Sequence, residues 1–212
     1  MFQLLWPAIW ETIIMVVPST VLAVLIGFIV AITLVLTDEK GFKPNKAIYI
    51  TLDFIINILR SLPFVILMVA IIPLTRFIVG KSYGEIAAIV PLTLASAPFI
   101  ARVIESALKE VDEGVIEAAK SFGATDMQII FRVMLKEAVP AIVSGITLSV
   151  ISIIGYSAMA GTIGANGLGA LAVRYGYQRF QTDVMIVTVI VLIIIVQIIQ
   201  GLGNYLYKKL SK

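Results

Sequence analysis

Residues 12–37 carry no charged side chain, and several other stretches of this sequence share that property. A helix of about 20 apolar residues is what crosses the roughly 30 Å hydrocarbon core of a bilayer. Hydrophobic residues make up 60% of the chain and charged residues only 14%, whereas soluble domains are about a quarter charged. The chain is therefore expected to be an all-α integral membrane protein embedded in a lipid bilayer.

The uncharged stretches predict five transmembrane helices, at about 17–37, 54–75, 85–104, 138–160 and 184–207. Pro91 and Pro98 lie inside the third span, where neighbouring helices can satisfy the freed backbone groups. In this division residues 1–16 form an N-terminal segment outside the cell, 17–207 the membrane domain and 208–212 a cytoplasmic tail. The longest inside loop covers 109–136.

The basic residues are unevenly distributed between the two sides of these spans, and cytoplasmic loops are the ones enriched in Lys and Arg. Arg60 sits at the inner end of the second span. One side carries eleven of the others: Lys40, Lys43, Lys46, Arg102, Lys109, Lys120, Arg132, Lys136, Lys208, Lys209 and Lys212. The opposite side carries four: Arg76, Lys81, Arg174 and Arg179. This asymmetry predicts an outside N-terminus and a cytoplasmic C-terminus.

The composition excludes several chemistries. The sequence contains no Cys and no His, so it lacks disulfides, thiolates and the commonest general base and metal ligand. We expect no catalytic residue, no metal site and no cofactor. The "GKS" at 80–82 resembles the end of a phosphate-binding loop, but Thr75 stands where that motif needs Gly.

Residues 111–135 predict two short helices joined by a glycine turn. Gly123 suits a left-handed helix stop, and Thr125 with Gln128 three positions later forms a capping box. Val111, Val115, Ala118, Ala119 and Phe122 fall on one apolar face, and Met127, Ile130, Phe131 and Met134 on another. The pattern alone leaves three alternatives: an amphipathic linker, a DNA-binding helix-turn-helix, or an element that docks on a cytoplasmic partner. The near balance of acids and bases and the tether between two spans argue against DNA, so we expect no nucleic-acid partner.

Other polar features have both a structural and a functional interpretation. Arg102 and Glu105 are spaced for a local ion pair. Asp53 is expected to reach water at the membrane interface, and Arg60 either does the same or faces a cavity or another subunit. The glycine-rich 155–169 is expected to provide either close packing with a turn or an outer gate.

"EAAKSFGATDMQIIFRVMLKEAVP", residues 117–140, resembles the cytoplasmic EAA loop of the permeases of binding-protein-dependent ABC importers. The resemblance implies the type I permease fold and makes this loop the coupling helix that sits in a cleft of the ATPase subunit. Leu135-Lys136 stands where the family has Leu-Pro, and Pro140 still follows. The residues that carry over to coupling are Glu117, Ala118, Ala119, Gly123 and Ala124.

Residues 57–80, 87–108 and 155–177 resemble the methionine branch of that family. The resemblance implies a bacterial cell-membrane homodimer that transports L- or D-methionine, bound to two ATP-binding subunits and served by a substrate-binding lipoprotein. It assigns the pathway and gate to Arg60, Ser61, Pro63, Tyr156, Ser157 and Met159. The alternatives are an importer of another small amino acid derivative or dipeptide, and an ion-coupled secondary transporter. The last fits poorly because four of the five spans have no acidic residue in their interior.

Overall fold

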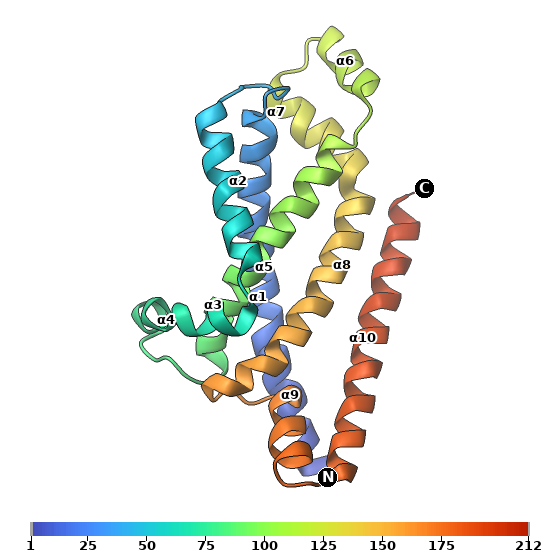
Figure 1. Ribbon diagram of the computed structural model, residues 1–212. Helices are drawn as coiled ribbons and strands as arrows, with labels where there is room; N and C mark the ends of the chain where they lie inside the picture. The colour runs from blue at the N-terminus through green and yellow to red at the C-terminus, as the bar shows by residue number, and fades with distance from the viewer. Residues whose placement is uncertain (1, 212) are drawn as a thin grey trace.

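The computed structural model describes residues 2–211, and long helices dominate this part of the chain (Figure 1). Four helical stretches are long and apolar enough to cross a membrane, and a bent helix pair makes a fifth. The four contain α1 (Phe2–Thr37), α5 (Glu85–Lys109), α8 (Leu135–Met159) and α10 (Thr182–Leu210). The all-helical membrane fold predicted from the sequence is confirmed.

The helices at the two ends of the chain extend beyond the expected spans. α1 already begins at Phe2, although a separate segment over 1–16 is expected, and α10 continues to Leu210, into the expected tail over 208–212. A charged residue such as Glu11 marks where a helix leaves hydrocarbon, but it does not end the helix. Residues 1 and 212 of these two expected segments lie outside the described residues.

The expected span over 54–75 is not one continuous helix. α2 (Lys46–Ser61) ends before Pro63, and α3 (Phe64–Ala70) leaves at 108° to it. Proline has no backbone N–H and pushes the preceding residue into an extended conformation, which Leu62 adopts with φ −82° and ψ 129°. A short α4 (Ile72–Val79) follows and ends at Gly80, whose φ is 81°.

Small residues allow the central helices to approach closely. A Cβ on Gly27 of α1 would lie 3.0 Å from the Ala97 carbonyl oxygen of α5. On the other side of α5, a Cβ on Gly145 of α8 would lie 2.1 Å from Val103. Both glycines are buried. α5 is therefore held tightly between α1 and α8 at the centre of the molecule.

α1 and α10 expose long rows of apolar side chains. On α10 only Val184, Thr188 and Gly203 are buried, and Figure 1 shows this red helix at the edge of the molecule beside α8. Its exposed residues include Ile186, Ile190, Ile193, Ile194, Ile198 and Leu202. A surface this apolar needs lipid or another protein chain to cover it.

Candidate functional site

The loop between α5 and α8 forms two short helices with a glycine turn. α6 (Glu113–Ser121) starts at Asp112, whose carboxylate accepts a hydrogen bond from the Gly114 N–H at 2.8 Å. α6 stops at Phe122, and Gly123 then takes φ 78°. The second helix begins with α7 (Asp126–Gln128) and continues as η1, a π-helical stretch over Ile129–Met134.

The predicted capping box is confirmed at the start of the second helix. The Thr125 N–H donates to Gln128 Oε1 at 2.9 Å, and the Gln128 N–H donates to Thr125 Oγ1 at 3.4 Å. These two bonds satisfy N–H groups that a helix start otherwise leaves without partners. The start of the second helix is therefore set by residues that are neighbours in the sequence.

α6 stands at one end of the molecule with no buried residue (Figure 1). Of the predicted coupling residues, Glu117, Ala118 and Gly123 are exposed. Ala119 and Ala124 instead pack against a buried apolar cluster that includes Ile129 and Ile130. The loop thus has an anchored face and a free face.

Phe122 is the most conspicuous side chain on the free face of this loop. It is 92% exposed, and the neighbouring Val115 is exposed as well. The spacing of apolar residues placed Phe122 on the apolar side of α6, but sequence reasoning did not count it as a site residue. An aromatic ring exposed to this extent beside other apolar side chains is typical of a surface that a partner covers.

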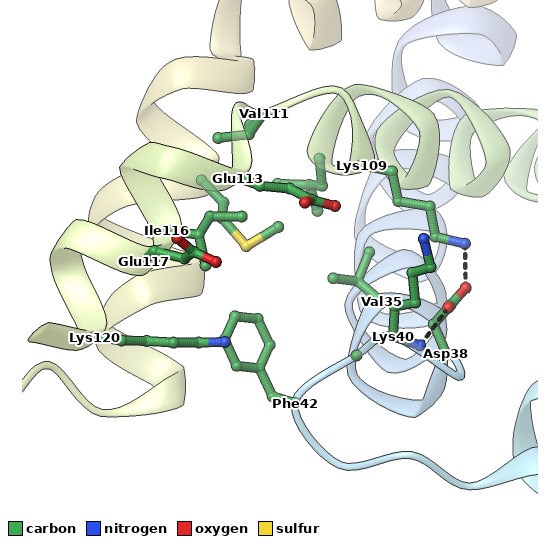
Figure 2. Close-up of a pocket in the computed structure, with 13 residues that line it drawn as sticks. Val35, Asp38, Lys40, Phe42, Lys109, Val111, Glu113, Ile116, Glu117 and Lys120 are labelled. Atoms are coloured by element: carbon green, nitrogen blue, oxygen red, sulfur yellow. Dashed lines mark hydrogen bonds and ion pairs between the residues drawn. The ribbon is translucent and has the colours of Figure 1, made fainter.

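A groove of about 520 Å³ separates α6 from the turn that follows α1. Figure 2 shows Glu113, Glu117 and Lys120 along the α6 side and Asp38 and Phe42 on the opposite side. The Lys120 ammonium lies 5.2 Å from the centroid of the Phe42 ring, within range of a cation–π contact. This contact links α6 to the α1–α2 turn.

A cluster of charges holds the C-terminal end of α5. The Glu105 side chain is only 2% exposed, and it accepts from Arg102 at 2.7 Å and from Lys109 at 2.8 Å. Lys109 also reaches Asp38 at 2.5 Å, and Arg102 also pairs with Asp53 of α2. The predicted Arg102–Glu105 pair is thus confirmed as part of a larger network.

Asp53 differs from its expected role, because it is half-buried against Arg102 rather than simply facing water. Asp53 lies 49 residues before Arg102 in the chain, and Asp38 lies 71 residues before Lys109. The spacing of residues along one helix could not reveal these two contacts. Outside the spans, the Lys109 ammonium holds the pKa of the Asp38 carboxyl below its usual range.

A second cavity, of about 240 Å³, lies where the α2–α3 break meets α5 and α8. Arg60 and Tyr156, both predicted pathway residues, line it together. It is also lined by residues that sequence reasoning missed: Phe64, Phe99, Ser96, Ser149 and Ser152. The serines could have been found in the sequence as hydroxyl side chains within otherwise apolar spans. Ser149 and Ser152, for example, are one helical turn apart.

The other four predicted pathway residues do not line this cavity. Ser61 and Pro63 are exposed at the break between α2 and α3. Ser157 is buried and donates to the Ile154 carbonyl oxygen at 2.7 Å. Met159 is exposed at the end of α8.

The glycine-rich segment packs closely and turns the chain back. Residues 155–169 begin in the last turn of α8 and continue through the 3-10 helix η2 (Ala160–Ile163) into α9 (Leu168–Leu171). The π-helical η3 (Ala172–Tyr177) follows. Gly167 has φ 111°, and a Cβ on Gly169 would lie 2.1 Å from the Ala158 Cα. The close packing and turn expected there are confirmed.

Hydrogen bonds attach this segment to two other helices. Asn166 donates twice to Glu85 of α5, from its backbone at 3.0 Å and its side chain at 2.9 Å. The Leu168 N–H donates to Thr12 Oγ1 of α1 at 3.0 Å. Both contacts lie far from α6, so α5 carries polar anchors at its two ends.

Comparison with known proteins identifies the class of this membrane fold. Residues 23–212 match the family described as "Binding-protein-dependent transport system inner membrane component". The chain belongs to this family and is an inner-membrane component of a binding-protein-dependent transport system.

Two similar proteins carry methionine in their names. The probable D-methionine transport system permease protein MetI of Vibrio cholerae is 46% identical over 99% of this chain and 93% of its own length. The methionine import system permease protein MetP of Bacillus subtilis is 45% identical, covering 98% and 94%.

This chain is also similar to chains of solved ABC transporter structures. A chain of the MetNI methionine ABC transporter, in a structure described as inward facing, matches with a TM-score of 0.96 and 43% identity over 99% of this chain and 97% of that one. A chain of an amino acid ABC transporter matches with a TM-score of 0.81 at 19% identity, over 98% and 94%, which shows a shared fold.

The contribution of the charge cluster to stability can be tested by substitution. Arg102→Met should leave Lys109 as the only cation that the described residues offer Glu105. We expect the free energy of unfolding to fall by about 2 kcal/mol, less than the roughly 3–5 kcal/mol lost when a buried pair is broken completely. We expect an apparent melting temperature in detergent about 4–8 °C lower. Arg132→Met, at an exposed arginine of the loop, is the control.

Adding Glu105→Gln should recover part of that loss, because it removes a buried carboxylate that has lost one of its two cations. Equal melting temperatures for the Arg102 and Arg132 variants would show that the cluster contributes nothing to stability.

Proposed function

We propose that this chain is the permease subunit of an ATP-driven importer and forms the pathway for L- or D-methionine across the cytoplasmic membrane. The observation that carries the proposal is identity of 45–46% to methionine permeases over nearly the whole chain. That alignment extends over the coupling loop and all the elements around the 240 Å³ cavity, so the parts that define a transporter are shared.

The chain works as a homodimer with two ATP-binding subunits and a substrate-binding lipoprotein. ATP is hydrolysed on the separate subunits. The free face of α6, with Glu117, Ala118 and the exposed Phe122, docks in a cleft of the ATPase, while Ala119 and Ala124 hold the loop to the membrane helices. This division of exposed and anchored residues is what a mechanical link between two subunits requires.

The transport cycle alternates between two states of the dimer. ATP binding closes the ATPase subunits and moves α6, and the membrane helices then open the pathway outward to receive substrate from the lipoprotein. Hydrolysis returns the dimer to the inward-facing state. Shifting such an equilibrium from 1:99 to 99:1 takes about 5.5 kcal/mol of differential binding, which ATP and the docked lipoprotein supply together.

The N-terminus lies outside and the C-terminus in the cytoplasm. The eleven-to-four distribution of basic residues supports this orientation. So does the placement of α6 and the start of α1 at opposite ends of the molecule (Figure 1). The division into an outer segment over 1–16, a membrane domain over 17–207 and a tail over 208–212 describes where the chain meets the lipid, with the helices continuing past those limits.

The pathway runs past the α2–α3 break and the end of α8. Arg60 and Tyr156 line it, and Ser61 and Pro63 form the bend. Ser157 and Met159 lie toward the glycine-rich segment, which acts as the outer gate. The polar anchors of that segment on α1 and α5 make its position sensitive to movements of both helices.

Gly123 tests the coupling role of the loop. A Cβ there meets nothing within 4 Å in this chain, so only its φ of 78° makes a side chain unfavourable. The left-handed conformation costs most residues about 1–2 kcal/mol, and asparagine tolerates it better. Gly123→Val should therefore reduce co-purification of the ATPase and abolish uptake, whereas Gly123→Asn should retain most of both.

Two results would change this interpretation. If the valine variant equals wild type, the loop is an ordinary linker. If both variants fail alike, the partner needs a bare glycine at this position rather than a left-handed turn.

The orientation is tested by labelling single cysteines, which the absence of native Cys makes clean. An impermeant maleimide added to intact cells should modify Ser82→Cys and leave Ser121→Cys unmodified until the cells are opened. The opposite pattern would overturn both the orientation and the cytoplasmic docking of α6.

The substrate is tested in a methionine auxotroph that lacks other methionine importers. Growth on low methionine should require this chain together with its ATPase and lipoprotein. Unlabelled methionine should compete fully with labelled methionine for uptake. Uptake could instead be ATP-dependent for another amino acid derivative or a dipeptide, with no competition by methionine. The chain would then still belong to an ATP-driven importer, but methionine would not be its substrate.

A further inference from the structure

The 240 Å³ cavity has one charged wall. Arg60 lines it from the last turn of α2. Within residues 2–211 the Arg60 guanidinium has no carboxylate partner, whereas Arg102 has two. A guanidinium presents five donors that match a carboxylate or phosphate in a bidentate fashion. The lining of the cavity contains no acidic residue.

The α5 wall carries a buried hydroxyl that bonds to nothing in the described residues. Ser96 is 4% exposed, and its Oγ has no hydrogen-bond partner. That oxygen is covered by surrounding atoms, so it reaches a ligand in the cavity only after a local shift of the α5 wall. Ser152 of α8 is exposed, donates to a carbonyl oxygen of its own helix and keeps acceptor capacity toward the cavity, whereas Ser149 is buried.

The third wall is aromatic. The rings of Phe64 and Tyr156 stack with centroids 4.9 Å apart, and Phe99 lies on the α5 side. Such faces suit an apolar side chain, and thioether sulfur makes favourable contacts with aromatic rings of about 0.3–1.5 kcal/mol. The volume of the cavity is below the roughly 300–1,000 Å³ of typical drug-sized sites, which limits it to one small molecule.

We propose that this cavity is a transient binding site for a single zwitterionic α-amino acid with an apolar side chain. Arg60 holds the α-carboxylate, the Ser152 hydroxyl contacts the polar end, and Phe64 and Tyr156 hold the side chain. The proposal rests on the proposed function and adds where the substrate is held within the pathway and in which orientation.

The same three walls explain why a zwitterion is preferred over a charged substrate and why the substrate is released readily. A second positive charge on the substrate would be repelled by Arg60, and a second negative charge would lie against aromatic rings. The ammonium meets only neutral hydroxyl oxygens, because no acidic residue lines the cavity. Binding is therefore weak, as a transport pathway requires if it is to pass its substrate on.

The experiment uses the purified permease–ATPase complex without lipoprotein or nucleotide, and a methionine analogue with a photoreactive diazirine in its side chain. After irradiation, mass spectrometry should find the label on the permease peptides that contain Phe64 or Tyr156. Methionine should prevent labelling. Methioninol, which lacks the carboxylate, should require a concentration at least about tenfold higher, the loss expected for one charge-assisted hydrogen bond.

Three variants complete the test. Arg60→Gln should reduce labelling about tenfold or more, and Arg60→Lys should keep part of it because the charge remains. Arg76→Gln is the matched control, since this exposed arginine of α4 does not line the cavity. Melting temperatures of all variants show that a loss does not come from unfolding.

Label outside these two peptides, equal competition by methioninol, or equal effects of Arg60→Gln and Arg76→Gln would each overturn the site. Wild-type complex that imports methionine but gives one of these results would remove this inference and leave the proposed function intact. The complex could instead import a different small amino acid and still show labelling that depends on Arg60. This result would support the binding site and overturn only the assignment of methionine as the substrate.

Discussion

A carboxylate buried near the C-terminal end of α5 constrains the rest of the structure. Glu105 is almost completely removed from solvent, and a buried charge is tolerated only with partners. Arg102 and Lys109 lie one turn before and after it, and each reaches a second acid, on α2 or in the turn after α1. α2 and the turn after α1 are thereby joined to α5, directly before the chain enters the loop over 109–136.

Because α5 is packed between α1 and α8, its position affects every other part of the site. One end of α5 holds the charge cluster, its middle places Ser96 beside the cavity, and Glu85 at the other end holds Asn166 of the glycine-rich segment. In the proposed mechanism, a displacement of the loop over 109–136 is passed to a helix that contacts both the cavity and the glycine-rich turn. The physical basis of the proposed coupling is a single helix with a polar anchor at each end, packed along its length through small residues.

The sequence predicted best those features that depend on neighbours along the chain. The left-handed Gly123, the Thr125–Gln128 capping box and the Arg102–Glu105 pair are all local, and all three are confirmed. The sequence did not reveal the sharp break at Pro63 within an expected span, because proline inside membrane helices is often tolerated. The contacts of Asp38 and Asp53, and the convergence of Ser96 with Arg60 and Tyr156, depend on packing between distant segments.

The energy source that drives transport can be measured directly as uptake by purified components. The permease and its ATPase are reconstituted into vesicles, with the lipoprotein and labelled methionine supplied on the outer face. Accumulation should require ATP on the face where the ATPase is bound and should be unaffected when proton and sodium gradients are collapsed. Accumulation driven by an imposed ion gradient in the absence of ATP would contradict the assignment of this chain to an ATP-driven importer.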